Sequence, residues 1–448
     1  MMKFTQNKLD QSRRIFSRER GTLVERDGTY ISKPKVSKET VNAVSLATLL
    51  YSGIVFPPDT IFSDFWAVGM GGTLSTDGTT VEYVEAEDLF ESHHDESEID
   101  PIDSLAKAMD VSGVDLNQCL LLLSEGKDST GIAIALAELG VKADCLTFAN
   151  SDTNVELVTD IAKRFGHRLE VVRYDDFTIP ESSLESLANV FEPTVDQAFL
   201  SYLLLPQDRF QNRTVIDGMG NDLYMGHLPT KQQLLATKVC NAVNLVSPKW
   251  FSDSLKGKCF QNSERCGIPF RSFSECQGFY NGFDRNLIRK LIAAPRSLDF
   301  IDQQWKSIGF EKARALSRGR YLDTYSFSGK SISLAEMASA KIYFPWADEK
   351  VALQFGRLSP DAKYQWPTIN KLPLREAINR RFNYQQPKVG FRAPVQEILA
   401  ANRQLLQSAV DESDLIPDPI KRQAFTGSKY ENRLVACALL ALWERANK

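Results

Sequence analysis

The feature that most constrains the fold is an alternation of strand and helix patterns that starts near residue 117. The continuous apolar run Asn117–Leu123 ends at a serine and leads to a glycine, which is typical of a strand buried on both faces of a parallel sheet. A helix pattern follows over Asp128–Leu139. The pattern repeats, with strands predicted over Lys142–Ala149, Arg168–Arg173 and Arg213–Asp217 and a helix over Asn154–Phe165. The alternation predicts an α/β fold with a doubly wound parallel sheet.

Two further regions flank this predicted sheet. Residues 1 to about 85 hold short apolar segments separated by turn residues, which predicts a small β-rich or mixed N-terminal module. Residues 86–104 are acidic and poor in apolar side chains, so we place a domain boundary there, between residues 1–104 and residues 105–448. Beyond residue 230 the chain is predicted to form a helical C-terminal part that includes Ser331–Lys341, Arg375–Phe382 and Glu431–Ala446.

Composition narrows the class of protein. A formal net charge of -4 gives no positive field for a polyanion, so nucleic acid is not an expected partner. Seven cysteines form an odd, sparse set without paired metal-ligand spacing, so neither a disulfide framework nor a zinc site is expected. No signal peptide is recognisable, and no apolar run reaches the ~20 residues that span a bilayer. We expect a cytoplasmic protein without a membrane partner.

The segment Ser124–Thr130 lies between the first predicted strand and the first predicted helix. Its sequence, SEGKDST, has the spacing of neither a Walker loop nor a GxGxxG loop. Helix N-termini at this edge of a parallel sheet attract anions, and the segment adds hydroxyls, a glycine and Asp128, which suits Mg²⁺. It resembles the SGGxDS loop of the PP-loop ATP pyrophosphatases. An accidental strand-to-helix turn is the alternative.

Four later segments narrow the resemblance. Residues 216–226 (IDGMGNDLYMG) resemble the second glycine and aspartate motif of the synthase domain of asparagine synthetases. Residues 336–348 (EMASAKIYFPWAD) resemble the stretch that leads to the PFLD-type loop of that family. Residues 370–375 (NKLPLR) and 386–391 (QPKVGF) resemble its K-x-x-LR and R-x-K-x-G-F elements. Their order along the chain is that of the family, which implies a PP-loop, adenine nucleotide alpha-hydrolase-like fold.

The resemblance also implies a chemistry. Synthase domains of this family bind ATP with Mg²⁺, adenylate a carboxylate with release of pyrophosphate, and let an amine attack the activated acyl group. The implied site residues are Asp128 and Asp222 for Mg²⁺; Ser124, Gly126, Ser129 and Thr130 for the β- and γ-phosphates; Gly218 for the nucleotide pocket; backbone groups of Leu123 and Phe148 for adenine; and Lys371 and Lys388 as catalytic lysines, Lys371 toward phosphate. The alternative is that both aspartates only cap helices and both lysines only lie on the surface.

The N-terminal module fits the same family. Val41–Leu74 is similar to the closing part of its glutaminase domain, whose opening half has no counterpart here. A glutaminase of that type uses an N-terminal cysteine as nucleophile, whereas this chain begins with methionine and its first cysteine is Cys119, inside a predicted strand. We therefore expect a truncated glutaminase-like module without glutamine hydrolysis.

Three residues depart from the family pattern. Glu125 replaces the second glycine of the loop, which places a carboxylate where phosphates should pass. Leu223 replaces the acid that usually follows Asp222. Lys341 stands where the family commonly has a glutamate base, a role that a lysine fills only with a strongly lowered pKa; Tyr321, Glu336 and Glu349 are the alternative bases.

These observations predict an ATP-dependent, AMP-forming amide synthetase that couples a small-molecule or peptide carboxylate to ammonia or a substrate amine. Two alternatives remain open at this stage: a degenerate synthase fold that binds a nucleotide or a partner without catalysis, and a PP-loop enzyme with a sulfur nucleophile. A biosynthetic partner protein and a homodimer are open as well.

Overall fold

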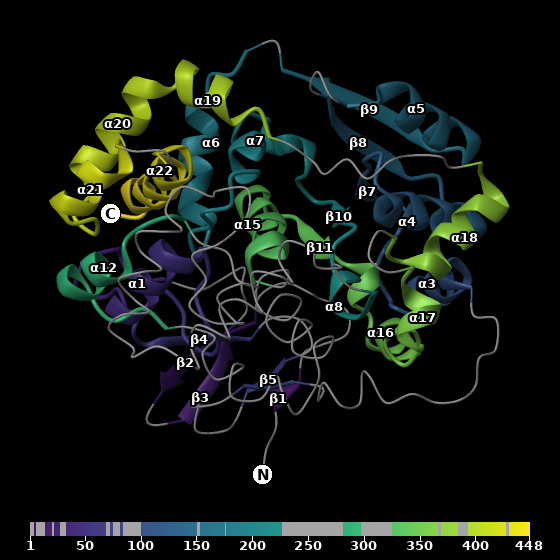
Figure 1. The fold of residues 1–448 in the computed structure, drawn as a ribbon, viewed down its shortest axis with the longest axis horizontal. Helices are drawn as coiled ribbons and strands as arrows, with labels where there is room; N and C mark the ends of the chain where they lie inside the picture. The colour runs from purple at the N-terminus through teal and green to yellow at the C-terminus, as the bar shows by residue number, and fades with distance from the viewer. Residues whose placement is uncertain are drawn as a thin grey trace, which may run out of the picture.

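A computed structural model of the 448-residue chain shows the architecture in Figure 1. It describes residues 4–5, 14–19, 22–26, 33–68, 72–74, 81–83, 100–149, 153–174, 176–225, 281–296, 325–365, 369–383, 393–426 and 430–448.

The centre of the molecule is a five-stranded parallel sheet with the order β11-β10-β7-β8-β9. Its strands are β7 (Cys119–Leu122), β8 (Asp144–Ala149), β9 (Arg168–Arg173), β10 (Thr214–Ile216) and β11 (Lys341–Tyr343). The four strands predicted from the sequence are confirmed. The fifth was missed, because the helix predicted over Ser331–Lys341 ends at Ala338 and the short edge strand begins at Lys341.

Both faces of the sheet are buried along β11, β10, β7 and β8, in agreement with the doubly wound prediction, whereas the edge strand β9 is partly exposed. Because successive side chains of a strand point to opposite faces, neighbouring residues of one strand enter different cores. Leu120, Leu146, Val215 and Ile342 join one hydrophobic core, whereas Leu121, Cys145, Ile216 and Tyr343 join the other. The continuous apolar pattern of these strands is therefore explained by burial on two sides.

Two groups of helices supply these cores, and Figure 1 shows them on opposite sides of the sheet. One group consists of α3 (Pro101–Asp110), α4 (Lys127–Glu138), α5 (Val155–Arg164), α16 (Glu349–Gly356) and α18 (Leu372–Arg381). The other begins with α6 (Glu181–Ser186), α7 (Phe199–Leu203) and α15 (Ser328–Ala338) and continues into the C-terminal helices α19 (Val395–Ala401), α20 (Arg403–Glu412), α21 (Asp418–Ala424) and α22 (Tyr430–Ala446). Three further helices are short: α8 (Asp222–Met225), α12 (Arg285–Leu291) and α17 (Pro360–Lys363).

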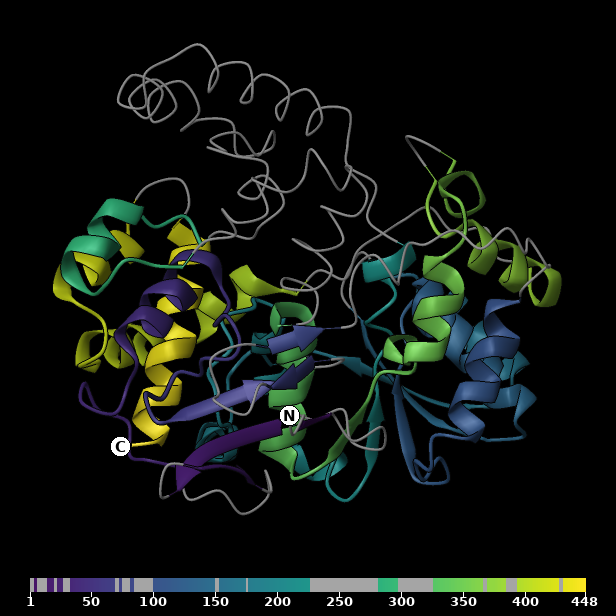
Figure 2. The ribbon, with the colours of Figure 1, turned by 90° about the horizontal axis from the view of Figure 1, so that it is seen from below.

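The N-terminal region is mixed, as predicted, and shares a core with the C-terminal helices. It contains α1 (Ala43–Ser52) and two three-stranded antiparallel sheets, formed by β1 (Phe4–Thr5), β5 (Gly72–Leu74) and β6 (Val81–Tyr83) and by β2 (Arg14–Glu19), β3 (Thr22–Arg26) and β4 (Phe65–Val68). The ring of Phe62 lies 5.9 Å from that of Trp443 in α22, and Figure 2 shows α1 beside the yellow C-terminal helix. The helix α3 spans the boundary that the sequence places after residue 104.

The strand order defines a particular place in the sheet. The chain moves outward from β7 to β8 and β9, and then returns to the other side of β7 to form β10 and β11. In open parallel sheets, ligands bind outside the carboxyl ends of the strands at the point where the order reverses, which is here between β7 and β10. None of the helices in the described ranges combines the length and the apolarity that crossing a bilayer requires.

Candidate functional site

The loop after β7 is held by its own hydroxyl groups. The N–H of Ser124 donates to Ser129 Oγ at 3.1 Å, and the N–H of Gly126 donates to Ser124 Oγ at 3.1 Å. The hydroxyl of Thr130 donates to the carbonyl of Gly126 at 2.9 Å. Gly126 is the N-cap of α4 and has no side chain that could cap the N–H groups of the first turn. The predicted phosphate loop is therefore a compact turn that leads into a helix N-terminus, which favours anions.

The loop after β10 lies against this helix N-terminus. A Cβ atom added to Gly218 would lie 3.1 Å from the backbone nitrogen of Ser129, so only glycine leaves that N–H uncovered. Gly220 has a φ of +116°, and a Cβ atom there would lie 2.8 Å from the backbone nitrogen of Ala347. Both glycines of this motif are thus required by close backbone approach, one toward α4 and one toward the turn after β11.

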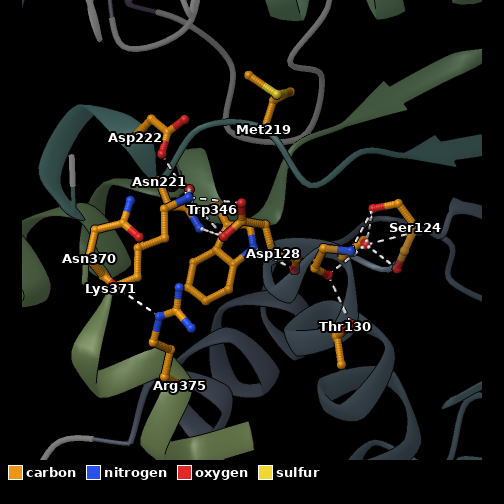
Figure 3. A network of polar contacts seen from close by, with 12 residues as sticks. Ser124, Asp128, Thr130, Met219, Asn221, Asp222, Trp346, Asn370, Lys371 and Arg375 are labelled. Atoms are coloured by element: carbon orange, nitrogen blue, oxygen red, sulfur yellow. Dashed lines mark hydrogen bonds and ion pairs between the residues drawn. The ribbon is translucent and has the colours of Figure 1, made fainter. Parts of the chain in front are cut away.

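A buried group of charges joins three distant segments, as Figure 3 shows. The ammonium of Lys371 lies 2.9 and 2.8 Å from the two carboxylate oxygens of Asp128 and 2.7 Å from Asp222 Oδ1. It also donates to Asn221 Oδ1 at 2.6 Å, while Asn221 Nδ2 donates to Asp128 Oδ1 at 2.7 Å. We call Asp128, Asn221, Asp222 and Lys371 the ion cluster. The structure therefore brings together three residues that the sequence predicts, and it uses neither aspartate as a plain helix cap.

The electrostatics of the ion cluster follow from its burial. The side chain of Lys371 is 3% exposed, that of Asp222 is 13% exposed and that of Asp128 is 31% exposed. Burial alone would lower the pKa of the Lys371 ammonium, but the charges of Asp128 and Asp222 and their hydrogen bonds outweigh burial and raise that pKa above its ordinary value. Lys371 is therefore a permanent cation at neutral pH and cannot serve as a base in this arrangement.

Two residues that the sequence analysis did not single out complete the site. Asn221 is 1% exposed and bridges Asp128 and Lys371. The indole Nε1 of Trp346 donates to the carbonyl of Asp128 at 3.0 Å, and the hydroxyl of Tyr224 donates to the carbonyl of Trp346 at 2.8 Å. Asn221 directly precedes Asp222, and Trp346 lies in the PWAD segment, so the same motifs could have pointed to both.

The departure at Glu125 has a structural explanation. Its side chain is buried, and Oε2 accepts a hydrogen bond from the backbone N–H of Asn154 at 2.8 Å. Asn154 is the N-cap of α5, which follows the neighbouring strand β8. The carboxylate of Glu125 is thus directed toward α5, where it joins two loops at the same edge of the sheet.

The departure at Lys341 concerns a residue at the other end of the strands. Lys341 is exposed, begins the edge strand β11 and pairs with Thr214, the first residue of β10, whereas Gly218 lies two positions after the last residue of β10. The alternative bases are also directed elsewhere or exposed. Glu336 Oε2 accepts from the N–H of Phe191 at 3.0 Å, and Glu349 is exposed in the first turn of α16.

The residues expected near adenine fit only in part. The N–H of Leu123 donates to the carbonyl of Leu146 at 2.9 Å, so this donor is already engaged within the sheet. Phe148 is half-buried, and its ring stacks on that of Tyr174 with centroids 6.2 Å apart. Of the backbone groups expected to face adenine, the N–H of Leu123 is thus bonded within the sheet, and contact of Leu123 and Phe148 with adenine stays a prediction. The aromatic side chains at the ends of β8 and β9 are further candidates for contact with a flat ring.

Several residues named from the sequence lie outside the described residues. These are Lys388, Tyr321 and the side chain of Leu223, together with four of the seven cysteines, Cys240, Cys259, Cys266 and Cys276. The three described cysteines, Cys119, Cys145 and Cys437, are free and buried, and burial raises the pKa of the Cys119 thiol to about 11, so it is a poor nucleophile.

The donor set of the ion cluster suits Mg²⁺ bound together with phosphates. No group of three metal-ligating side chains occurs among the described residues, but Mg²⁺ usually takes only one or two protein carboxylates and completes its shell with water and phosphate oxygens. Asp128 and Asp222 supply those two carboxylates beside an uncapped helix N-terminus.

No protein-family model matches the chain, and a search of curated proteins returns no significant match. Function therefore rests on the chemistry of this site.

Proposed function

We propose that the chain is an ATP-dependent, AMP-forming amide synthetase of the asparagine synthetase-like, PP-loop type. The observation that carries the proposal is the position of Asp128, Asp222 and Lys371, which converge beside the N-terminus of α4 where the strand order reverses. That position combines an anion-binding helix end with two carboxylates and a buried cation. The motif resemblance supplies the reaction class.

Each part of the site has a role in this proposal. The first-turn N–H groups of α4 bind phosphate oxygens, and Gly218 leaves room for the ligand to approach them. Asp128 and Asp222 would hold Mg²⁺, which when bound neutralises charge on the phosphates. The substrate carboxylate displaces pyrophosphate from the α-phosphorus of ATP, and the amine then displaces AMP from the acyl carbon. Asn221 keeps Asp128 in place while charge shifts between these groups.

The test is exchange of pyrophosphate into ATP in the presence of candidate carboxylates, from amino acids to peptides with acidic side chains. We expect at least one carboxylate to support exchange, and Asp128→Asn to reduce its rate by about a hundredfold, the size expected for losing one charge-stabilising group. The matched control is Asp160→Asn, because Asp160 is an exposed carboxylate on α5. If ATP analogues bind but no carboxylate supports exchange, the non-catalytic alternative holds; if no ATP analogue binds, the nucleotide proposal is wrong.

A further inference from the structure

The ammonium of Lys371 has no hydrogen left for an external ligand. It lies within 2.9 Å of four oxygen atoms, two from Asp128 and one each from Asn221 and Asp222. An ammonium group carries three N–H donors, so these contacts already saturate it. In the arrangement seen here, Lys371 therefore acts as a counter-ion of the two carboxylates and does not present its charge to a phosphate.

The same oxygens are the ones that would hold a divalent cation. Mg²⁺ requires a nearly ideal octahedron of oxygen ligands at short distances. The ammonium of Lys371, in contact with both carboxylates, repels a divalent cation from them. Asp128 is 31% exposed, so its oxygens can be reached from solvent while the ammonium behind them is 3% exposed. Lys371 and a divalent cation therefore compete for one pair of carboxylates.

The backbone conformation of Lys371 is one that needs support from the contacts of its side chain. Lys371 has φ 56° and ψ 44°, a left-handed conformation that is unfavourable for a residue with a Cβ atom. It stands at the N-terminal end of α18, and its side chain caps no N–H group of that helix. The contacts with Asp128 and Asp222 offset this strain.

From these observations we propose that Lys371 is a resident counter-ion that excludes a divalent cation from Asp128 and Asp222 until a phosphate ligand draws the ammonium away. Metal binding and nucleotide binding are then coupled, and each strengthens the other. The part that concerns nucleotide rests on the proposed function, whereas the competition between Lys371 and the metal does not. The role differs from a fixed phosphate contact, because removal of the lysine strengthens binding of the metal alone.

The test is Mn²⁺ binding to the full-length protein without nucleotide, measured by electron paramagnetic resonance. Lys371→Met is expected to bind Mn²⁺ at least tenfold more tightly than the wild type and to gain thermal stability when Mn²⁺ is added. The matched control is Lys142→Met, which removes an exposed lysine and should bind Mn²⁺ as the wild type does. Equal Mn²⁺ affinity of Lys371→Met and the wild type would overturn the proposal.

Two additions keep the test decisive. If Lys371→Met does not fold, Lys371→Gln keeps a hydrogen-bond donor near both carboxylates and should show the same gain in Mn²⁺ affinity. In the wild type, α,β-methylene ATP should raise Mn²⁺ affinity, and tight Mn²⁺ binding without nucleotide would contradict the counter-ion role. Failure of the nucleotide analogue to bind would reject the proposed function, while the nucleotide-free comparison would still decide the role of Lys371.

Discussion

The loops that follow β7 and β10 both contain glycine and both lead into a helix, yet they hold their shape by different means. The first loop is closed by hydroxyl groups of residues only a few positions apart, such as Ser124 and Ser129. The second depends on close contact with other segments, because Gly218 touches α4 and Gly220 touches the turn at Ala347. A locally bonded loop tolerates loss of one group, whereas a loop fitted between backbones does not tolerate an added atom.

The largest effect is expected for Gly220→Ala. The new Cβ atom would lie 2.8 Å from the nitrogen of Ala347 at a φ of +116°, so strain and overpacking together should cost about 3 kcal/mol of unfolding free energy. Chemical denaturation measures this loss. Gly140→Ala is the control, because Gly140 has a φ of +73° but no atom within 4 Å of the added Cβ. Equal losses in the two variants would mean that the contact with Ala347 is unimportant.

Ser129→Ala should have the second largest effect on stability. Its buried hydroxyl accepts the N–H of Ser124 and lies 3.2 Å from the carbonyls of Ser124 and Gly126, and leaving these groups without a partner should cost about 1.5 kcal/mol. The same denaturation experiment applies, with Ser182→Ala as an exposed control on α6. A loss as small as that of the control would show that the hydroxyls do not hold the first loop.

Gly218→Ala should change binding more than stability. The added Cβ atom would lie 3.1 Å from the nitrogen of Ser129, which requires a shift of a few tenths of an ångström and should cost about 1 kcal/mol. Because the methyl group covers an N–H of α4, affinity for α,β-methylene ATP should fall at least tenfold in equilibrium titration. The control is Gly329→Ala in α15, where no atom lies within 4 Å of the added Cβ atom, and it should leave affinity for the nucleotide analogue unchanged. Unchanged affinity of Gly218→Ala for the nucleotide analogue would mean that the N-terminus of α4 does not bind it.

The smallest effect concerns pH and the helix that follows the first loop. His167 joins α4 to the chain before β8, since its ring lies 2.7 Å from the carbonyl of Ala133 and accepts the N–H of Ala143 at 3.2 Å. Burial lowers the pKa of His167, so the unfolded chain takes up a proton first as pH falls below about 6.5. The contribution of His167 to the unfolding free energy should therefore be complete above that pH and decrease toward pH 5.5. His167→Gln should have a smaller decrease, and an identical pH profile would exclude His167 as its source.

The sequence predicted the strands and helices of the fold better than the contacts between them. The strands and helices of the sheet were recognisable because burial on two faces and a helical period leave local patterns, as in Cys119–Leu122 and Lys127–Glu138. The strand β11 was missed, because the helix pattern that precedes it was extended to Lys341, although the helix ends at Ala338. The loops at Ser124 and Gly218 were found because glycine, hydroxyl and acidic residues follow predicted strands.

What only the tertiary structure decided is how these parts combine. Lys371 pairs with Asp128 across 243 positions and with Asn221 across 150, and no local pattern encodes such pairs. Likewise, the direction of Glu125 depends on a neighbouring loop, and the distance of Lys341 from the site depends on strand direction. The sequence by itself determined which segments form strands, helices and glycine loops, because those follow from local burial and backbone preferences. The ion cluster was decided by the strand order, which brings the ends of β7 and β10 together and lets α18 place its buried lysine between two carboxylates.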